Sequence, residues 1–111
     1  MQLTALDQKI MLAIVNLHPN AYGVSIQDHI RERTREKPPS IGSLYAALGR
    51  LEDRGFIKPR DGEATPERGG RAKVYFSLTP KGQAALLQSL EALRSLGALS
   101  KLALGSALVP A

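Results

Sequence analysis

Cysteine is absent from this chain of 111 residues, and tryptophan is absent as well. Without cysteine, a disulfide scaffold, a thiolate metal site and a cysteine nucleophile are all excluded. Such a chain fits a reducing compartment, and we expect a cytoplasmic protein. Aromatic residues make up only 5% of the chain. The core must therefore be built from leucine, isoleucine, valine and alanine.

A long uncharged apolar run is also missing. The most apolar stretch, residues 83–104, is interrupted by Glu91, Arg94 and Lys101, whereas a membrane-spanning helix needs about twenty predominantly apolar residues. The N-terminus lacks the basic segment and apolar run that mark a signal peptide. We therefore expect no membrane partner and no secretion signal.

Residue types that carry catalysis are present but not in a catalytic arrangement. His18 and His29 are separated and have no acidic residue at metal-ligand spacing. Glu52 and Asp53 are adjacent, so on a helix their side chains diverge. The run at 69–71 lacks the lysine and hydroxyl pair of a phosphate-binding loop. The sequence predicts that the protein is not an enzyme and uses no metal or cofactor.

Positive charge is the first feature that points to a partner. The net charge is +5, and twelve of the 15 lysines and arginines lie between Arg31 and Lys81. Clustered cations suit a polyanion such as DNA. A solvated basic surface on an ordinary protein would give the same count, so charge alone does not decide.

The segment that starts at Ser40 has the pattern of a short amphipathic helix. Pro38 and Pro39 prevent helix upstream, Ser40 is a favourable N-cap, and Gly55 is typical of the residue just past a helix end. One apolar stripe follows helical spacing, and it consists of Leu44, Ala47, Leu48 and Leu51.

The opposite face of this helix is unusual because its residues are mostly small. A solvent-facing helix normally carries long charged side chains there, whereas a face of small residues permits close approach to another surface, such as the major groove of DNA. This face consists of Gly42, Ser43, Ala46, Gly49 and Arg50, with Tyr45 beside them.

The remaining pattern predicts helices over 4–17 and 25–35, strands over 56–60 and 73–78, and a basic, glycine-containing loop between the strands. A leucine-rich helix follows Thr79-Pro80, and Gly97 and Gly105 indicate that it breaks late. The order is α-α-α-β-wing-β-α, a mainly helical winged helix-turn-helix with a small β-hairpin. We assign residues 1–82 to the winged helix, 83–104 to a C-terminal dimerisation helix and 105–111 to a disordered tail.

This last helix exposes more apolar surface than one helix beside a small core can bury, and such surface usually marks an interface. We therefore expect a homodimer built from residues 83–102, with the first helix packing against the partner. The leucines expected to form the interface are Leu86, Leu87, Leu90, Leu93 and Leu96.

Several motifs in this order resemble the PadR family of winged-helix transcriptional regulators. They are Ala21-Tyr22-Gly23, Gly42-Ser43-Leu44-Tyr45-Ala46-Ala47-Leu48, Leu51-Glu52, Gly55-Phe56-Ile57, Gly70-Arg71, Lys73-Val74-Tyr75 and Leu78-Thr79-Pro80-Lys81-Gly82. The resemblance implies a homodimeric repressor that binds double-stranded DNA at a palindromic operator, releases it on binding a small-molecule effector or on another signal, and dimerises through its last helix. The related MarR family shares the wing but has more helix on both sides.

Candidate DNA contacts have structural alternatives. Ser43 lies in the early turns that meet bases in helices of this class. The family pattern implies a phosphate contact for Tyr45, although a helical tyrosine often only packs. Arg50 reaches phosphate or is simply solvated. The expected contacts from the third helix are Ser40, Gly42, Ser43, Tyr45 and Arg50.

Two further groups complete the expected surface. Tyr22 and Gly23 lie at a helix N-terminus, which suits a phosphate but equally suits a tight turn. Arg68, Arg71 and Lys73 in the wing are suited to the minor groove or to phosphates, unless they belong to a mobile charged loop. The alternative function is a winged-helix interaction module without DNA binding, which would carry apolar or acidic residues on the outer face of the third helix.

Overall fold

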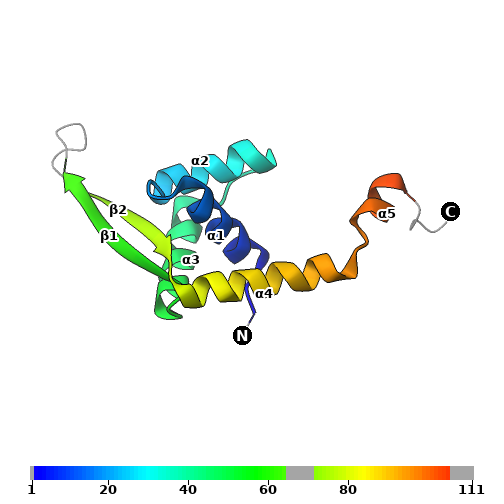
Figure 1. The fold of residues 1–111 in the computed structure, drawn as a ribbon. Coiled ribbons are helices and arrows are strands. Elements are labelled where there is room, and N and C mark those ends of the chain that lie inside the picture. The colour runs from blue at the N-terminus through cyan, green and yellow to red at the C-terminus, as the bar shows by residue number, and fades with distance from the viewer. Residues whose placement is uncertain (1, 65–71, 106–111) are drawn as a thin grey trace.

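The computed structural model describes residues 2–64 and 72–105 and has the predicted winged-helix order (Figure 1). Three helices are followed by an antiparallel hairpin, a long helix and a short one. In chain order the elements are α1 (Ala5–Leu17), α2 (Gly23–Thr34), α3 (Ile41–Asp53), β1 (Ile57–Ala64), β2 (Ala72–Leu78), α4 (Pro80–Leu96) and α5 (Leu99–Leu104).

Local capping explains where three of the helices begin. The Thr4 hydroxyl accepts from the backbone N–H of Asp7, and the Asp7 carboxylate accepts from that of Thr4. The Ser40 hydroxyl caps α3 by accepting from the backbone N–H of Ser43. The Thr79 hydroxyl caps α4 by accepting from the backbone N–H of Gly82. Because each cap satisfies a backbone donor left free in the first turn, these starts could be predicted from sequence.

The core lies between α1, α2 and α3 and is closed by the hairpin and the start of α4. The apolar stripe predicted for α3 is confirmed, since all four of its residues are buried. The other large core side chains come from every neighbouring element, and they are Ile10, Met11, Ile14, Ile26, Ile30, Phe56, Ile57, Phe76 and Leu86.

Two elements differ in length from the prediction. The second helix begins at Gly23 rather than Ser25, because Tyr22 is already its N-cap. The first strand runs from Ile57 to Ala64, beyond the predicted end at residue 60, with a register shift between Asp61 and Ala64. Pro59 does not end the strand, because a two-stranded hairpin leaves each strand one unpaired edge where proline is tolerated.

The C-terminal helix is divided, and it starts before residue 83. Pro80 is the first residue of α4, and Gly97, with φ of 62°, ends it. Figure 1 shows α4 passing along one side of the three-helix body, with α5 at its far end, away from the rest. The predicted late break at Gly97 is therefore confirmed. Of the tail expected to be disordered, residues 105–111, Gly105 ends α5 as its C-cap, and residues 106–111 lie outside the described residues.

The leucines expected at a dimer interface fall into two groups. Leu86 is buried in the core of its own chain, which corrects its assignment to the interface, and Leu90 packs partly against the same core. Leu87, Leu93 and Leu96 are exposed. Leu86 turns inward because the first turns of α4 complete the core. Within the described residues, no helix is both long enough and apolar enough to cross a membrane.

Candidate nucleic-acid interface

The outer face of α3 is open and small, as its sequence indicates. Ser43, Ala46 and Arg50 are exposed along it. Beyond its chain neighbours and the nearby backbone of α3, a methyl group added at Gly42 or Gly49 would meet no atom of the described residues within 4 Å. Neither glycine is therefore required by packing inside the protein, although each weakens a helix. Within the described residues, this face is therefore left open.

The two serines at the start of α3 form a small polar group. The Ser40 hydroxyl accepts from the Ser43 backbone N–H at 3.1 Å and donates to the Ser43 hydroxyl at 3.0 Å. This arrangement uses the Ser40 hydroxyl locally, as a cap. The Ser43 hydroxyl keeps its own proton for an acceptor outside the protein. Of the two candidate contacts, Ser43 is thus better placed for base recognition.

Gly23 and Tyr45 join the start of α2 to α3. A methyl group at Gly23 would overlap the phenol hydroxyl and ring of Tyr45. Tyr45 nevertheless remains 51% exposed. Gly23 therefore has a packing reason to be glycine, and Tyr45 combines packing through one part of its ring with access to solvent through another.

A contact between Tyr22 and Lys73 places the hairpin beside the N-terminus of α2. The Lys73 ammonium lies 4.2 Å from the centre of the Tyr22 ring, within the range of a cation–π interaction. The Tyr22 ring in turn meets Tyr75 edge to face, with centroids 5.8 Å apart. Three predicted contact residues, Tyr22, Gly23 and Lys73, are thus gathered at the N-terminus of α2. Arg68 and Arg71 lie outside the described residues.

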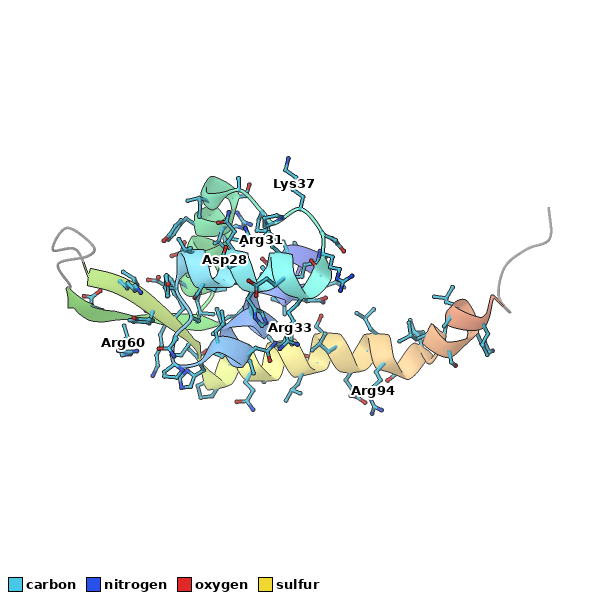
Figure 2. All side chains as sticks on the ribbon, turned by 90° about the horizontal axis from the view of Figure 1, so that it is seen from above. Asp28, Arg31, Arg33, Lys37, Arg60 and Arg94 are labelled. Carbon is cyan, nitrogen blue, oxygen red and sulfur yellow. The ribbon has the colours of Figure 1, made fainter. Side chains whose placement is uncertain are left out.

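Not all cations of the central segment belong to this surface. Arg31 pairs with Asp28 at 3.0 Å and Lys9 with Glu36 at 3.2 Å. Arg54 is turned inward, where its side chain is 16% exposed and lies 3.8 Å from the buried Asp7 carboxylate. The remaining labelled cations in Figure 2 are spread over α2, the loop after it, the hairpin and α4, and they are Arg33, Lys37, Arg60 and Arg94.

Sequence reasoning missed Tyr75, which meets the Tyr22 ring, and it missed Arg60 and Gly62, which lie against the Tyr75 ring. Arg60 and Tyr75 are cross-strand partners in the hairpin, and the arginine lies 4.9 Å from the ring centre. A cationic residue and an aromatic residue in the two predicted strands were a usable signal. It could not be read without the register of the strands, because a shift of one residue would place them on opposite faces.

The described titratable residues do not form an acid–base or metal site at the α3 face. The pKa of Arg94 is raised above its ordinary value by the side-chain hydrogen bonds that it donates to Glu91. That pair lies on α4, far along the chain from the α3 face. In the described part of the chain, no three histidine or acidic residues are grouped closely enough to hold a metal ion.

The fold and the open α3 face define a winged helix-turn-helix protein. Residues 11–88 match the Transcriptional regulator PadR-like family. Because this match covers more than half of the sequence, the chain belongs to that family. Its members are transcriptional regulators and not enzymes, which confirms the predicted family and class. No curated protein sequence matches the chain.

Solved structures agree with this assignment. A transcriptional regulator from Clostridium thermocellum is 27% identical with a TM-score of 0.69, and the alignment covers 94% of this chain and 90% of that one. A PadR family transcription regulator from Clostridium difficile R20291 is 24% identical with a TM-score of 0.67, covering 91% and 99%. Bacillus subtilis PadR, in complex with operator DNA, is 23% identical with a TM-score of 0.62, covering 78% of this chain and 46% of that one.

Proposed function

We propose that this regulator binds double-stranded DNA with the exposed face of α3 in the major groove and the hairpin against the flanking backbone. The open face around Gly42 and Gly49 carries the proposal, since no contact within the described part of the chain accounts for it. An α-helix fits the major groove when its outward side chains are short enough for close approach. Ser43 is the base-facing candidate, with Ser40, Tyr45 and Arg50 beside it on α3.

The residues proposed to contact the DNA sugar-phosphate backbone are Tyr22, Gly23 and Lys73, together with Arg68 and Arg71 of the wing. The Bacillus subtilis PadR structure, which contains operator DNA, supports DNA binding by a protein of this fold. Its similarity covers 78% of the present chain. We also propose a cytoplasmic location, because a regulator that binds bacterial operator DNA must be in the compartment that contains the DNA.

We also propose a homodimer that represses transcription from a palindromic operator. One winged helix reads a single half-site, and two-fold symmetric sites require two. Leu87, Leu93 and Leu96 on α4 are exposed, as are Leu12 and Val15 on α1. Exposed apolar side chains on two adjacent helices are typical of a subunit interface.

Release from DNA by a small ligand, or by another signal, is the remaining part of the proposal. A groove of about 500 Å³ lies between α1, β2 and α4, a size within the range of ligand sites. Its lining is mainly apolar, with His18, Ser77 and Gln83 as the polar groups. It borders Leu12 and Val15, so an occupant there would act on the same helices that hold the dimer together.

Fluorescence anisotropy tests the DNA-binding part directly. The labelled duplex contains the DNA immediately upstream of the protein's own coding region, and a scrambled duplex is the control. We expect tight binding to an inverted repeat in the upstream duplex, with affinity that falls as salt rises. Equal, weak binding to both duplexes would contradict an operator function and favour the interaction module.

Repression and dimerisation need separate measurements. A reporter placed behind the upstream region should be expressed more strongly when the regulator is deleted. Sedimentation of the full chain at low micromolar concentration should show a dimer. A monomer that binds a palindrome tightly would contradict the proposed assembly.

A further inference from the structure

Four side chains form a row where the hairpin meets the start of α2, with a cation at each end and two aromatic rings between them. We call this row the wing-root stack, and in order it consists of Lys73, Tyr22, Tyr75 and Arg60. The Lys73 ammonium lies 4.2 Å from the Tyr22 ring centre, and the Arg60 guanidinium 4.9 Å from the Tyr75 ring centre. Between them the two rings meet at 86°, with centroids 5.8 Å apart. A cation thus lies at each end of an aromatic pair.

The hairpin register creates this row. Residues two apart in a strand share a face, so Lys73 and Tyr75 lie on one side of β2 while Phe76 turns into the core. Tyr75 is the cross-strand partner of Arg60. On the other strand, a methyl group at Gly62 would overlap the edge of the Tyr75 ring. Gly62 therefore lets the ring lie flat against the backbone of β1.

Backbone contacts fix the position of the stack relative to α2. The Phe76 N–H donates to the Ala21 carbonyl at 2.8 Å. Arg60 donates to the Pro19 carbonyl at 3.4 Å. The Tyr22 N–H donates to the Ser25 hydroxyl at 2.9 Å. The hairpin and the turn before α2 are thus joined by main-chain as well as side-chain contacts.

We propose that Tyr75 is a positioning residue for DNA binding, which holds the Tyr22 ring so that Lys73 is presented at the N-terminus of α2 before DNA arrives. The inference rests on the proposed function, because it assigns a role in that function to a residue outside the expected contact set. Tyr75 itself need not touch DNA. Arg60 and Gly62 support it from the other side of the ring.

The physical advantage of this arrangement is preorganisation. An exposed lysine samples many rotamers, and ordering it on binding opposes association. When its ammonium already rests on an aromatic face, much of that ordering has occurred in the free protein. The ring also stabilises the cation without neutralising it, so its charge remains available to a phosphate.

The free protein gives the first test, independent of DNA. Protons above an aromatic face resonate upfield, so the Lys73 ε-methylene should be shifted upfield in an NMR spectrum of the wild type. Tyr75→Leu should move that resonance toward its random-coil position, and Gly62→Ala should do the same by displacing the ring. Tyr75→Phe keeps the ring, and Val74→Ala changes the neighbouring exposed residue, so both should resemble the wild type. An unchanged Lys73 resonance in Tyr75→Leu would overturn the proposal.

The second test measures binding to a random-sequence duplex as a function of salt. Tyr75→Leu should weaken binding roughly threefold to tenfold. It should also flatten the slope of log affinity against log salt by up to about one unit, the effect expected of Lys73→Gln. The double variant should bind no more weakly than Lys73→Gln alone, because the two residues act through one contact. A loss of stability by itself would leave the salt slope unchanged.

These outcomes distinguish a failure of the proposed DNA binding from a failure of the positioning role of Tyr75. If the wild type binds no duplex, the proposed function fails, while the NMR measurement still decides whether Tyr75 orders Lys73. If Tyr75→Leu shifts the Lys73 resonance but leaves the slope intact, or if the two substitutions are additive, the positioning role is overturned.

Discussion

The glycine positions differ in whether an added methyl group would fit. The difference separates glycines that the packing of the protein requires from glycines that it does not require. At Gly23, Gly62 and Gly82 an added methyl group would overlap Tyr45, Tyr75 and the Phe56 carbonyl, respectively. At Gly42 and Gly49 it would meet nothing. The first three are explained by the interior of the protein. In the proposed DNA complex, the last two would let α3 approach the major groove closely.

Ser43 allows a test at a single side chain. We predict that Ser43→Glu abolishes operator binding with little change in stability, since the position is exposed and a carboxylate there would face phosphates and base acceptors. Binding is measured by anisotropy and stability by thermal melting. Ser43→Ala is the size control, and Ala5→Glu adds the same charge on α1.

The Ser43→Glu prediction can fail in two recognisable ways. A variant that melts well below the wild type would show that the Ser43 side chain is needed for the fold. A variant that binds the operator as well as the wild type would place α3 outside the interface.

At the scale of the element, the glycines of α3 predict opposite effects on stability and binding. Gly49→Ala should raise the free energy of unfolding by about 1 kcal/mol, because alanine favours the helix and its methyl group meets no neighbour. The same methyl group would enter the DNA interface and lower affinity. Gly82→Ala is the contrasting variant and should be strongly destabilised. A Gly49→Ala protein with both higher stability and unchanged affinity would contradict close approach at that point.

The proposed wing contacts predict how DNA affinity depends on salt concentration. Each phosphate contact contributes nearly one unit to the slope of log affinity against log salt. Replacing Arg71 and Lys73 together with glutamine should lower affinity and flatten the slope by roughly one to two units. The measurement is a salt titration of duplex binding. A slope equal to that of the wild type would remove these residues from the interface.

The whole molecule is elongated, with principal extents of 59 × 28 × 21 Å. Much of the length comes from α4 and α5, which extend past the three-helix body (Figure 1). Along them Leu93, Leu96, Leu99 and Leu104 are more than half exposed. In the proposed homodimer, a second copy would cover these leucines.

Assembly is tested by removing that apolar surface without touching the core. If the proposed homodimer is correct, Leu93→Gln with Leu96→Gln should give a monomer in sedimentation, since both leucines are exposed in the single chain and glutamine favours helix. Circular dichroism and thermal melting check that the fold is retained. Operator affinity should fall because half-sites no longer act together. An intact dimer would exclude this part of α4 from the interface.

Truncation is less discriminating than these substitutions. A chain stopped after Gly82 would lose dimerisation but would also lose Leu86, which belongs to its own core. Such a chain is expected to be poorly soluble or unfolded. Only surface substitutions on distal α4 separate assembly from folding.

The amino-acid sequence by itself determined the element order, the helix starts at Thr4, Ser40 and Thr79, and the buried stripe of α3. These features depend on interactions within a few residues, such as caps and helical periodicity. The open face of α3 followed from the same periodicity. It could therefore be located, with its small residues, before any three-dimensional information.

Tertiary structure alone decided which distant residues meet. It buried Leu86, turned Arg54 toward Asp7, set Tyr45 against Gly23 and assembled the wing-root stack. In each case the outcome depends on the relative placement of two elements, and on strand register in the hairpin. Sequence periodicity specifies the face on which a residue lies, whereas packing specifies what that face touches.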